Sequence, residues 1–232
     1  MSDGNARSLA QVHLLEDLSA AEIGRLEQAC SWRTYAAQEQ IIDRQSDTQD
    51  VYFVAAGAAR VVIYSLSGRE ITLDDVNAGG HFGDLAAIDG EPRSASVMAL
   101  RDTVIASLSQ ERFLQLLSEH FTVTLRLMRA LTRIVRTSTD RIMDLSTLAA
   151  NNRVQADLLR LARNNMVGEN RAELKPIPVH GDIASRVSTT RETVARVLSD
   201  LSRQGMVERQ KDRLVVDDVD RLEDMVEEVR GE

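Results

Sequence analysis

Cysteine is almost absent from this chain, which holds only Cys30 among its 232 residues. A single thiol excludes an internal disulfide and any zinc or iron–sulfur site built from cysteines alone. The four histidines lie far apart in the sequence and share no spacing that is typical of metal ligands. We therefore expect no metal site.

Long apolar runs are also missing. No stretch approaches the ~18–20 residues that a membrane span needs, and residues 1–11 lack the basic and then apolar pattern of a secretory signal. There is no Ser/His/Asp set and no GxxxxGK[ST] phosphate loop. With 43% hydrophobic and 28% charged residues, the chain is expected to be a globular cytoplasmic protein without a membrane partner, and not an enzyme.

The net charge of −8 argues at first against a nucleic-acid partner. The charges are unevenly distributed, however: residues 176–215 hold seven Lys and Arg against five acids (+2), whereas residues 216–232 hold two arginines against eight acids (−6). Salt screens the electrostatic field of a charged side chain within roughly 8–10 Å. DNA therefore interacts mainly with the charges of the face that it contacts. A mildly basic face predicts weak non-specific binding and leaves more of the affinity to base contacts.

The first half of the chain has the pattern of a small β-structure. Ser19-Ala-Ala-Glu22 is a capping box, which predicts a helix to about Cys30. Short alternating or β-branched runs follow, separated by glycine-containing turns. They lie at 51–55, 60–64, 70–76, 95–99 and 103–108. Many short strands with glycine turns indicate an antiparallel roll or barrel.

From about Ser109 the hydrophobic period changes to 3.6 and continues for some forty residues without proline or glycine. Two apolar stripes can be traced along this predicted helix. One consists of Phe121, Leu125, Met128, Val135, Ile142 and Ala149, and the other of Leu127, Leu131, Ile134, Leu145 and Leu148. A helix that is apolar on two faces has two partners. We expect one face to cover the roll and the other to form a parallel two-fold seam with a second copy; a long helix buried in a monomer is the alternative.

The last third has the pattern of a winged helix-turn-helix. After an interruption at Asn151-Asn152, helices are expected at 154–162, 182–187 and 190–204, the last ended by Gly205. The other expected features are a polar loop at 168–175, a strand entry at 176–178, a hairpin at 207–216 and an acidic amphipathic helix at 219–229.

We therefore expect an α+β protein in three parts. These are an antiparallel β-roll domain (1–119), a long dimerisation helix (120–150) and a winged helix-turn-helix domain (151–232).

Residues 82–95 contain the first motif with clear chemistry, Phe82-Gly-Asp-Leu-Ala followed by Pro92-Arg-Ser-Ala. Gly83 permits close approach of the backbone to a ligand. Amides at a helix start attract phosphate, and Arg93 can pair with it bidentately. The pattern indicates a site for a small anion, although Arg93 could instead pair with Asp84 or Glu91.

The second motif is Thr190-Arg-Glu-Thr-Val-Ala-Arg196. Arg191, Glu192 and Arg196 lie in the N-terminal half of a predicted helix, the half that enters a DNA groove. Arginine bonds guanine bidentately and glutamate accepts from cytosine, each with ~1–3 kcal/mol of discrimination. The alternative is a solvated helix in which Glu192 and Arg196 pair.

Together the two motifs resemble those of the cyclic-AMP receptor protein (catabolite activator, CRP–FNR) family of bacterial transcription factors, over about residues 14–216. The resemblance implies that cyclic AMP, with cyclic GMP as the close alternative, is the effector. It assigns the cyclic phosphate to Arg93 and Ser94 and places Asp84 where the family has a glutamate on the ribose 2′-hydroxyl. We call residues 82–95 the phosphate-binding cassette. Its remaining residues are Phe82, Gly83, Leu85, Ala86 and Ala95.

Ser138-Thr139 matches the Thr-Ser pair that contacts the purine in the family. The helical phase agrees with this resemblance. Ser138 continues the stripe expected to face the roll, whereas Thr139 falls on the expected dimer seam. One hydroxyl would then contact the ligand within its own subunit, and the other would do so from the partner.

On the DNA side, the resemblance implies that Arg191, Glu192 and Arg196 contact bases in half-sites like TGTGA. Candidate phosphate contacts are Thr189, Thr190, His180 (where relatives often carry arginine), Arg203, Arg209, Lys211 and Arg213. In this interpretation a cyclic nucleotide reorients the two recognition helices of a homodimer on double-stranded DNA. The resemblance also implies RNA polymerase as a further partner, contacted through the loop at 168–175.

Two alternatives keep the same architecture. The protein could sense another effector, such as a gas bound to haem with His81 as a ligand. It could also be a ligand-independent DNA-binding dimer.

Overall fold

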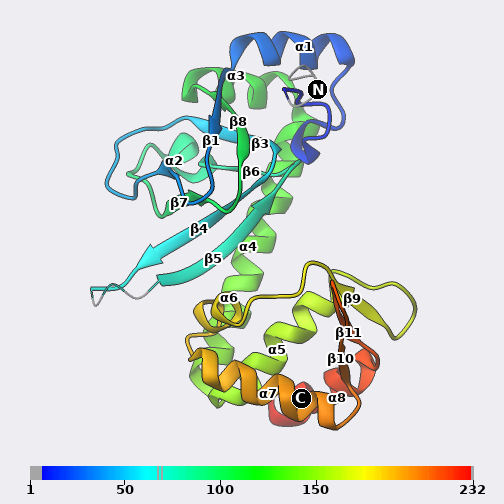
Figure 1. Cartoon of the computed structure of the whole chain (residues 1–232). Helices are drawn as coiled ribbons and strands as arrows, with labels where there is room; N and C mark the ends of the chain where they lie inside the picture. The colour runs from blue at the N-terminus through cyan, green and yellow to red at the C-terminus, as the bar shows by residue number, and fades with distance from the viewer. Residues whose placement is uncertain (1–6, 67, 69, 231–232) are drawn as a thin grey trace. The chain divides into compact units, whose positions relative to one another are not determined.

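The structure, a computed structural model, describes residues 7–66, 68 and 70–230 (Figure 1). It divides into two compact units, 1–133 and 134–232. The boundary falls within one continuous helix, α4 (Phe121–Thr147).

The first unit contains the expected antiparallel β-roll, made of two four-stranded sheets. One sheet has the order β1 (Ser31–Tyr35), β8 (Thr103–Leu108), β3 (Val51–Ala56) and β6 (His81–Phe82). The other has the order β2 (Gln40–Ile42), β7 (Ser96–Ala99), β4 (Ala58–Tyr64) and β5 (Glu70–Asn77). The five predicted strands are confirmed. Strands β1, β2 and β6 were not expected from the sequence, because they are short or largely exposed.

Strand β3 explains how the core of the roll is divided. Its first four residues are all buried, and successive side chains point to opposite faces. Val51 and Phe53 pack into a cluster with helical residues such as Phe113, whereas Tyr52 and Val54 pack into the cluster between the sheets. A strand buried on both faces loses the polar alternation of an edge strand and becomes a continuous apolar run.

The capping box predicted at Ser19 is confirmed at the start of α1 (Ala20–Ala29). The Ser19 hydroxyl accepts from the Glu22 amide at 3.3 Å, and the Glu22 carboxylate accepts from the Ser19 amide at 2.7 Å. A 3₁₀ turn at His13–Leu15 precedes it and buries Leu14 and Leu15.

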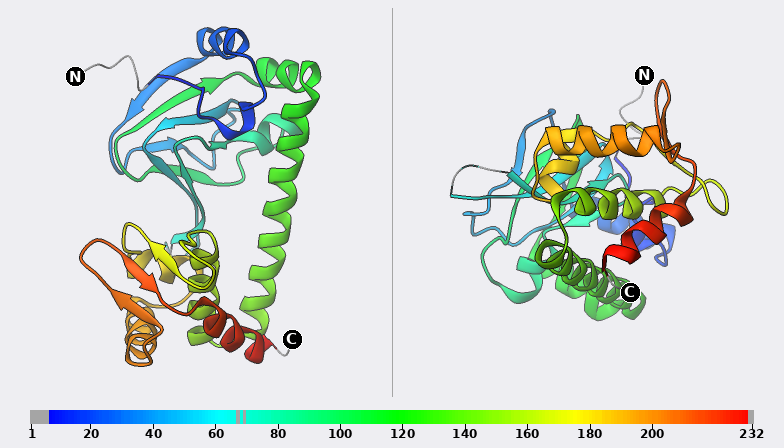
Figure 2. Two further views of the ribbon diagram at one scale, coloured as in Figure 1. Left: turned by 90° about the vertical axis from the view of Figure 1, so that its right-hand side faces the viewer. Right: turned by 90° about the horizontal axis from the view of Figure 1, so that it is seen from below.

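The single long helix expected from Ser109 is in fact two helices, α3 (Gln110–Glu119) and α4, with a sharp bend at His120 (Figure 2). The backbone of His120 is extended, and the Thr124 hydroxyl donates to the Leu117 carbonyl at 2.6 Å next to the bend. The hydrophobic period of 3.6 residues did not indicate this break, because Leu116 of α3 and Val123 of α4 are buried in the same cluster and continue the apolar spacing.

The two stripes of α4 differ in burial. Leu127 is buried in the core of the roll and Leu131 packs against it, as expected. The expectation is wrong for the rest of that stripe: Leu148 is buried in the core of the second unit, and Ile134 and Leu145 are exposed. The other stripe remains on the surface, with Phe121 71%, Met128 47%, Val135 64% and Ile142 63% exposed.

The second unit is a winged helix-turn-helix. Its helices are α5 (Ala150–Arg163), α6 (His180–Arg186), α7 (Arg191–Arg203) and α8 (Val219–Arg230). A three-stranded sheet of order β10 (Val207–Arg209), β11 (Leu214–Val216) and β9 (Ala172–Leu174) forms the wing. Leu158, Ile183, Val194, Leu201 and Leu222 lie in its core, and α5 contacts α6, α7 and α8 (Figure 2, right).

Three local expectations in this unit are wrong. Strand β9 lies inside the segment 168–175 that was expected to be loop, and 176–178 is not a strand; β9 forms because β11 pairs with it. The helix break falls at 148–149, and Asn151-Asn152 lie within α5. Arg153 supports the break by donating to the carbonyls of Leu148 (2.8 Å) and Val187 (2.9 Å).

Phe53 of β3 is fully buried against the helices of the roll and provides a test of this core. Phe53→Ala should lower the free energy of unfolding by about 3–5 kcal/mol, because it opens a cavity. Leu114→Ala on the exposed face of α3 is the control and should change it by less than about 1 kcal/mol. Urea denaturation followed by circular dichroism measures both; equal effects would contradict the assigned core.

Candidate functional site

The segment after β6 folds into a tight turn and a short helix. Gly83 adopts a left-handed conformation (φ +85°) as the N-cap of α2 (Asp84–Asp89), and Gly90 (φ +73°) ends that helix. A Cβ on Gly83 would lie 2.8 Å from both the Asp50 carbonyl oxygen and Nη1 of Arg93. Glycine is therefore required here by the backbone conformation and by the close approach of two other segments.

The Arg93 guanidinium is buried beside this turn, and the residue is only 4% exposed. Nη1 donates to the Gly83 carbonyl at 3.0 Å, Nη2 to the Asp50 carbonyl at 2.8 Å and Nε to the Thr48 hydroxyl at 3.2 Å. In the described part of the chain its hydrogen bonds thus go to neutral oxygens rather than to Asp84 or Glu91. Burial lowers the pKa of Arg93, but an arginine keeps its charge at any physiological pH.

Phe82 and Asp84, which lie on either side of Gly83 in the sequence, are also buried at this turn. Asp84 is 8% exposed, and its carboxylate lies 3.7 Å from Nε2 of His81. The Phe82 ring stacks on Tyr52 at 5.2 Å, and Tyr52 also lies under the Arg93 guanidinium. The structure therefore brings Phe82, Gly83, Asp84 and Arg93 together.

The other predicted cassette residues divide into two groups. Ala86 and Ala95 are buried, whereas Leu85 and Ser94 are exposed. Thr48, Asp50 and Tyr52 also contact Arg93, and the sequence did not indicate them. No motif marks them, because it is the pairing of Tyr52 with Phe82 between β3 and β6 that brings this segment to the turn.

Ser138 and Thr139 lie on α4 within the second unit, and both are exposed. The Thr139 hydroxyl donates to the Val135 carbonyl at 3.0 Å, one helical turn earlier. This local bond is typical of threonine in a helix and can be exchanged for another acceptor.

The start of α7 presents the second motif. The Thr190 hydroxyl accepts from the Thr193 amide at 3.2 Å and caps the helix, and the Thr189 amide donates to the Ala184 carbonyl of α6. Arg191 and Glu192 are exposed in the first turn. Hydrogen bonds from its own backbone amide and from Thr190 lower the pKa of Glu192, which keeps its carboxylate an acceptor.

Arg191 and Arg196 of α7 each contact a residue of another helix. A Cβ on Gly181 would lie 3.0 Å from Nε of Arg191, so this side chain lies against the start of α6. Arg196 is exposed, and its Nη2 donates to Oδ1 of Asn151 at 3.1 Å. Asn151 was expected only as part of an interruption between two helices; its contact with Arg196 is a finding of the structure.

The remaining predicted phosphate contacts differ in their surroundings. Arg203 pairs with Asp200, and Arg213 pairs with Asp212 and Glu173. Hydrogen bonds from Lys175 and Arg213 lower the pKa of Asp212 to about 2. By contrast, Arg209 and Lys211 are exposed on the wing, and His180 is half-buried at the start of α6.

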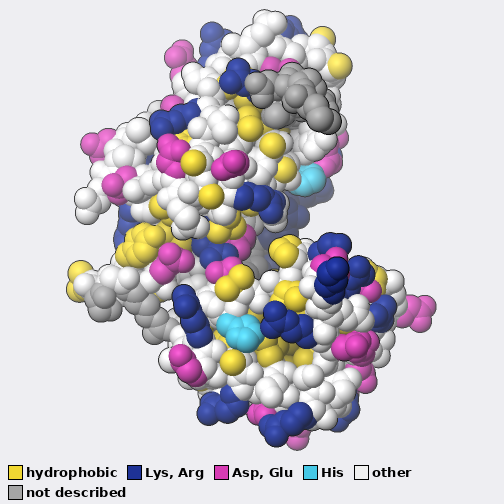
Figure 3. Space-filling model, viewed as in Figure 1, with side chains coloured by type: hydrophobic (Ala, Val, Ile, Leu, Met, Phe, Trp, Pro, Cys, Tyr) yellow, Lys and Arg dark blue, Asp and Glu magenta, His cyan; other side chains and the backbone are white. Residues whose placement is uncertain are grey.

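In Figure 3, Lys and Arg side chains are interspersed with acidic ones over the helical unit that contains α6 and α7. Among the described residues, no helix is long and apolar enough to cross a membrane, and no three His, Cys, Asp or Glu side chains form a group that could hold a metal ion.

Comparison with known proteins agrees with both motifs. The family model for the cyclic nucleotide-binding domain matches residues 32–120, and the model for the Crp-like helix-turn-helix domain matches residues 152–225. A cyclic AMP receptor protein of Thermus thermophilus is 34% identical over 175 residues, which cover 75% of this chain and 78% of the relative. The chain belongs to the CRP–FNR family of transcription regulators.

Solved structures show the same fold at lower identity. A CooA mutant from Carboxydothermus hydrogenoformans matches this CRP–FNR regulator with a TM-score of 0.80 and 21% identity, over 97% of each chain. The c-di-GMP responsive regulator CLP of Xanthomonas campestris matches with a TM-score of 0.66 and 20% identity, over 85% of this chain and 99% of its own.

The two glycines that bound α2 provide a matched pair of variants. Both have positive φ, so Gly83→Ala and Gly90→Ala each incur about 1–2 kcal/mol of backbone strain. Only Gly83→Ala also brings a Cβ against the Asp50 carbonyl and Arg93; the nearest atom to a Cβ at 90 is 3.9 Å away. Gly83→Ala should therefore lower the urea midpoint of unfolding clearly more than Gly90→Ala does, and equal losses would contradict the described approach.

Proposed function

We propose that this CRP–FNR regulator is a homodimer that binds a cyclic nucleotide, cyclic AMP or else cyclic GMP, and then binds palindromic DNA with TGTGA-like half-sites. The observation that carries the proposal is the buried Arg93 guanidinium, whose hydrogen bonds go to neutral oxygens beside a glycine-capped helix start. A desolvated cation of this kind gains more from an anionic partner than an exposed one does.

In the proposed complex, Arg93 exchanges carbonyl oxygens for the cyclic phosphate, with Ser94 and the amides after Gly83 as further donors. Asp84 accepts from the ribose 2′-hydroxyl. Ser138 contacts the purine from within the subunit and Thr139 does so from the partner. The relatives named above include a cyclic AMP receptor protein and a c-di-GMP responsive regulator, so the identity of the effector is part of the proposal.

The proposed dimer uses the exposed stripe of α4. Phe121, Met128, Val135 and Ile142 follow one another at intervals of seven residues and are all exposed in the single chain. A heptad-spaced apolar stripe is the pattern of a helix that packs along a second helix. Residues 120–150 would therefore act as the dimerisation helix between the two other domains.

On DNA, Arg191, Glu192 and Arg196 are the proposed base contacts in the major groove. Thr189, Thr190, His180, Arg203 and Lys211 are the proposed backbone contacts. Because Arg203 already has an acidic partner, we expect Lys211 to contribute more to phosphate binding. The protein would act in the cytoplasm, and the segment 168–175 is the proposed surface for RNA polymerase.

A titration tests the sensor. Cyclic AMP or cyclic GMP should increase binding to a TGTGA palindrome, and Arg93→Gln should weaken nucleotide binding by about 10- to 100-fold, because it removes charge-assisted hydrogen bonds. Isothermal calorimetry and fluorescence anisotropy measure the two steps, and circular dichroism checks that the variant is folded.

If DNA affinity were the same with and without either nucleotide, the proposed response would be wrong. A ligand-independent dimer would bind the palindrome with the same affinity whether or not a nucleotide is present. Absorbance of the purified protein near 400 nm would instead indicate a haem-based sensor.

A pair of variants separates base contacts from phosphate contacts. Arg191→Gln should reduce the preference for the palindrome over random DNA by about 1–3 kcal/mol, because arginine bonds guanine bidentately. Lys211→Gln should weaken binding to both DNAs alike and reduce the salt slope by about 1. Anisotropy titrations at several salt concentrations measure both effects; equal loss on both DNAs for Arg191→Gln would contradict direct base contact.

A further inference from the structure

His81 of strand β6 lies directly before the phosphate-binding cassette and contacts one of its residues. Nε2 of His81 lies 3.7 Å from Oδ2 of Asp84. Both side chains are largely shielded from water, with 15% of His81 and 12% of Asp84 exposed. A shielded pair of this kind interacts more strongly than an exposed pair at the same distance.

The backbone fixes the position of this imidazole. His81 pairs across the sheet with Phe53 of β3, whose side chain is fully buried. The preceding residue of β3, Tyr52, lies under the Arg93 guanidinium. Because successive side chains of a strand point to opposite faces, the imidazole lies on the Phe53 face of these strands and the guanidinium on the Tyr52 face. His81 therefore contacts Asp84 without competing with Arg93 for space.

The contact with His81 involves only one of the two carboxylate oxygens of Asp84. A donor on Oδ2 fixes the rotation of the carboxylate and leaves Oδ1 as an acceptor. The imidazole donates from Nε2 when it is protonated and also in one of its two neutral tautomers. The separation of 3.7 Å is longer than a hydrogen bond, but a shift of less than about 1 Å would bring the two atoms to hydrogen-bond distance.

We infer that His81 is a positioning residue of the proposed nucleotide site, where it orients Asp84 for recognition of ribose. Its imidazole donates to Oδ2 of Asp84, and Oδ1 then accepts from the ribose 2′-hydroxyl. A binding group held by a second hydrogen bond keeps its geometry better than one held by its own side chain alone. The inference rests on the proposed function, and it assigns the distinction between ribose and deoxyribose to the pair of residues.

The test measures the affinity of the full chain for cyclic AMP and for its 2′-deoxy analogue by isothermal calorimetry, and does the same for the cyclic GMP pair. The unaltered chain should bind the ribose form about 10- to 100-fold more tightly, because the deoxy form leaves a charged acceptor without its hydrogen bond. His81→Phe keeps a ring but removes the donor, and should reduce this ratio to about 3-fold or less. Its affinity for the deoxy form should not change, whereas a merely structural role would weaken both forms.

Three further variants control this result, and circular dichroism checks that each is folded. His81→Gln retains an N–H donor and should retain most of the ratio. Asp84→Asn should lower the ratio as His81→Phe does, and the double variant should lower it no further. His120→Phe is the matched control, because Nδ1 of His120 lies 3.9 Å from Oε1 of Glu22, a similar pair in the same unit but outside the cassette. It should leave the ratio unchanged.

An unchanged ratio in His81→Phe, or equal weakening of both forms, would overturn the inference and leave the proposed function intact. The same holds if the unaltered chain binds the ribose and deoxy forms with equal affinity. If it binds neither cyclic AMP nor cyclic GMP, the proposed function is wrong and the inference with it.

A second measurement does not depend on variants. Crystals grown with the cyclic nucleotide that binds should show Nε2 of His81 within hydrogen-bond distance of one carboxylate oxygen of Asp84 and the ribose 2′-oxygen at the other. An imidazole turned away from Asp84 beside a bound nucleotide would overturn the inference.

Discussion

The buried guanidinium of Arg93 is the interaction on which the first unit depends. It joins three segments, because it donates to Thr48 and Asp50 of one loop and to Gly83 of another from its own loop. Burying a cation is costly, and two carbonyls and a hydroxyl offset only part of that cost. The glycine at 83 follows from this arrangement, because a larger residue would displace either the guanidinium or the backbone that it bonds. The proposed nucleotide site is thus held in shape before any ligand arrives, which reduces the ordering that a ligand would have to impose.

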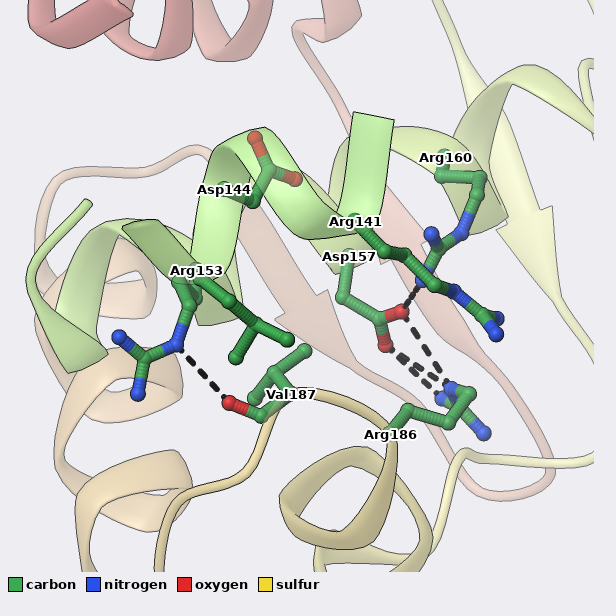
Figure 4. Close-up of a pocket in the computed structure, with 8 residues that line it drawn as sticks. Arg141, Asp144, Arg153, Asp157, Arg160, Arg186 and Val187 are labelled. Carbon is green, nitrogen blue, oxygen red and sulfur yellow. Dashed lines mark hydrogen bonds and ion pairs between the residues drawn. The ribbon is translucent and has the colours of Figure 1, made fainter. Parts of the chain in front are cut away.

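The second unit buries the opposite charge. Asp157 holds α5 to α6 through Arg186 (Figure 4), much as Arg93 holds its three segments. In both places the buried charge is held by partners from more than one element, so loss of one partner would leave it less compensated. The difference lies in the number of charges: Arg93 has neutral acceptors, whereas Asp157 is surrounded by more than one cation.

The sequence predicted those parts whose signals are local. The capping box at Ser19 and the alternating strands depend on neighbouring residues, and they are confirmed. The parts that it missed depend on distant partners: β9 forms on β11, and β1, exposed apart from Trp32 and Tyr35, forms on β8. The same reason explains why Tyr52 and Asp50 were not expected beside Arg93, and why nothing marked Asp157, whose arginine partners lie three and 29 residues away.

The stripe on α4 connects the two proposed activities. In the proposed dimer, the heptad residues from Phe121 to Ile142 fix how the two long helices cross, and each helix leads directly into α5. Two recognition helices on successive major grooves must lie ~34 Å apart, so a small change in the seam alters their fit to DNA. Thr139 lies between Val135 and Ile142 on this stripe. A ligand bound there therefore acts on the geometry that sets the spacing, provided that it prefers one arrangement of the seam over the other.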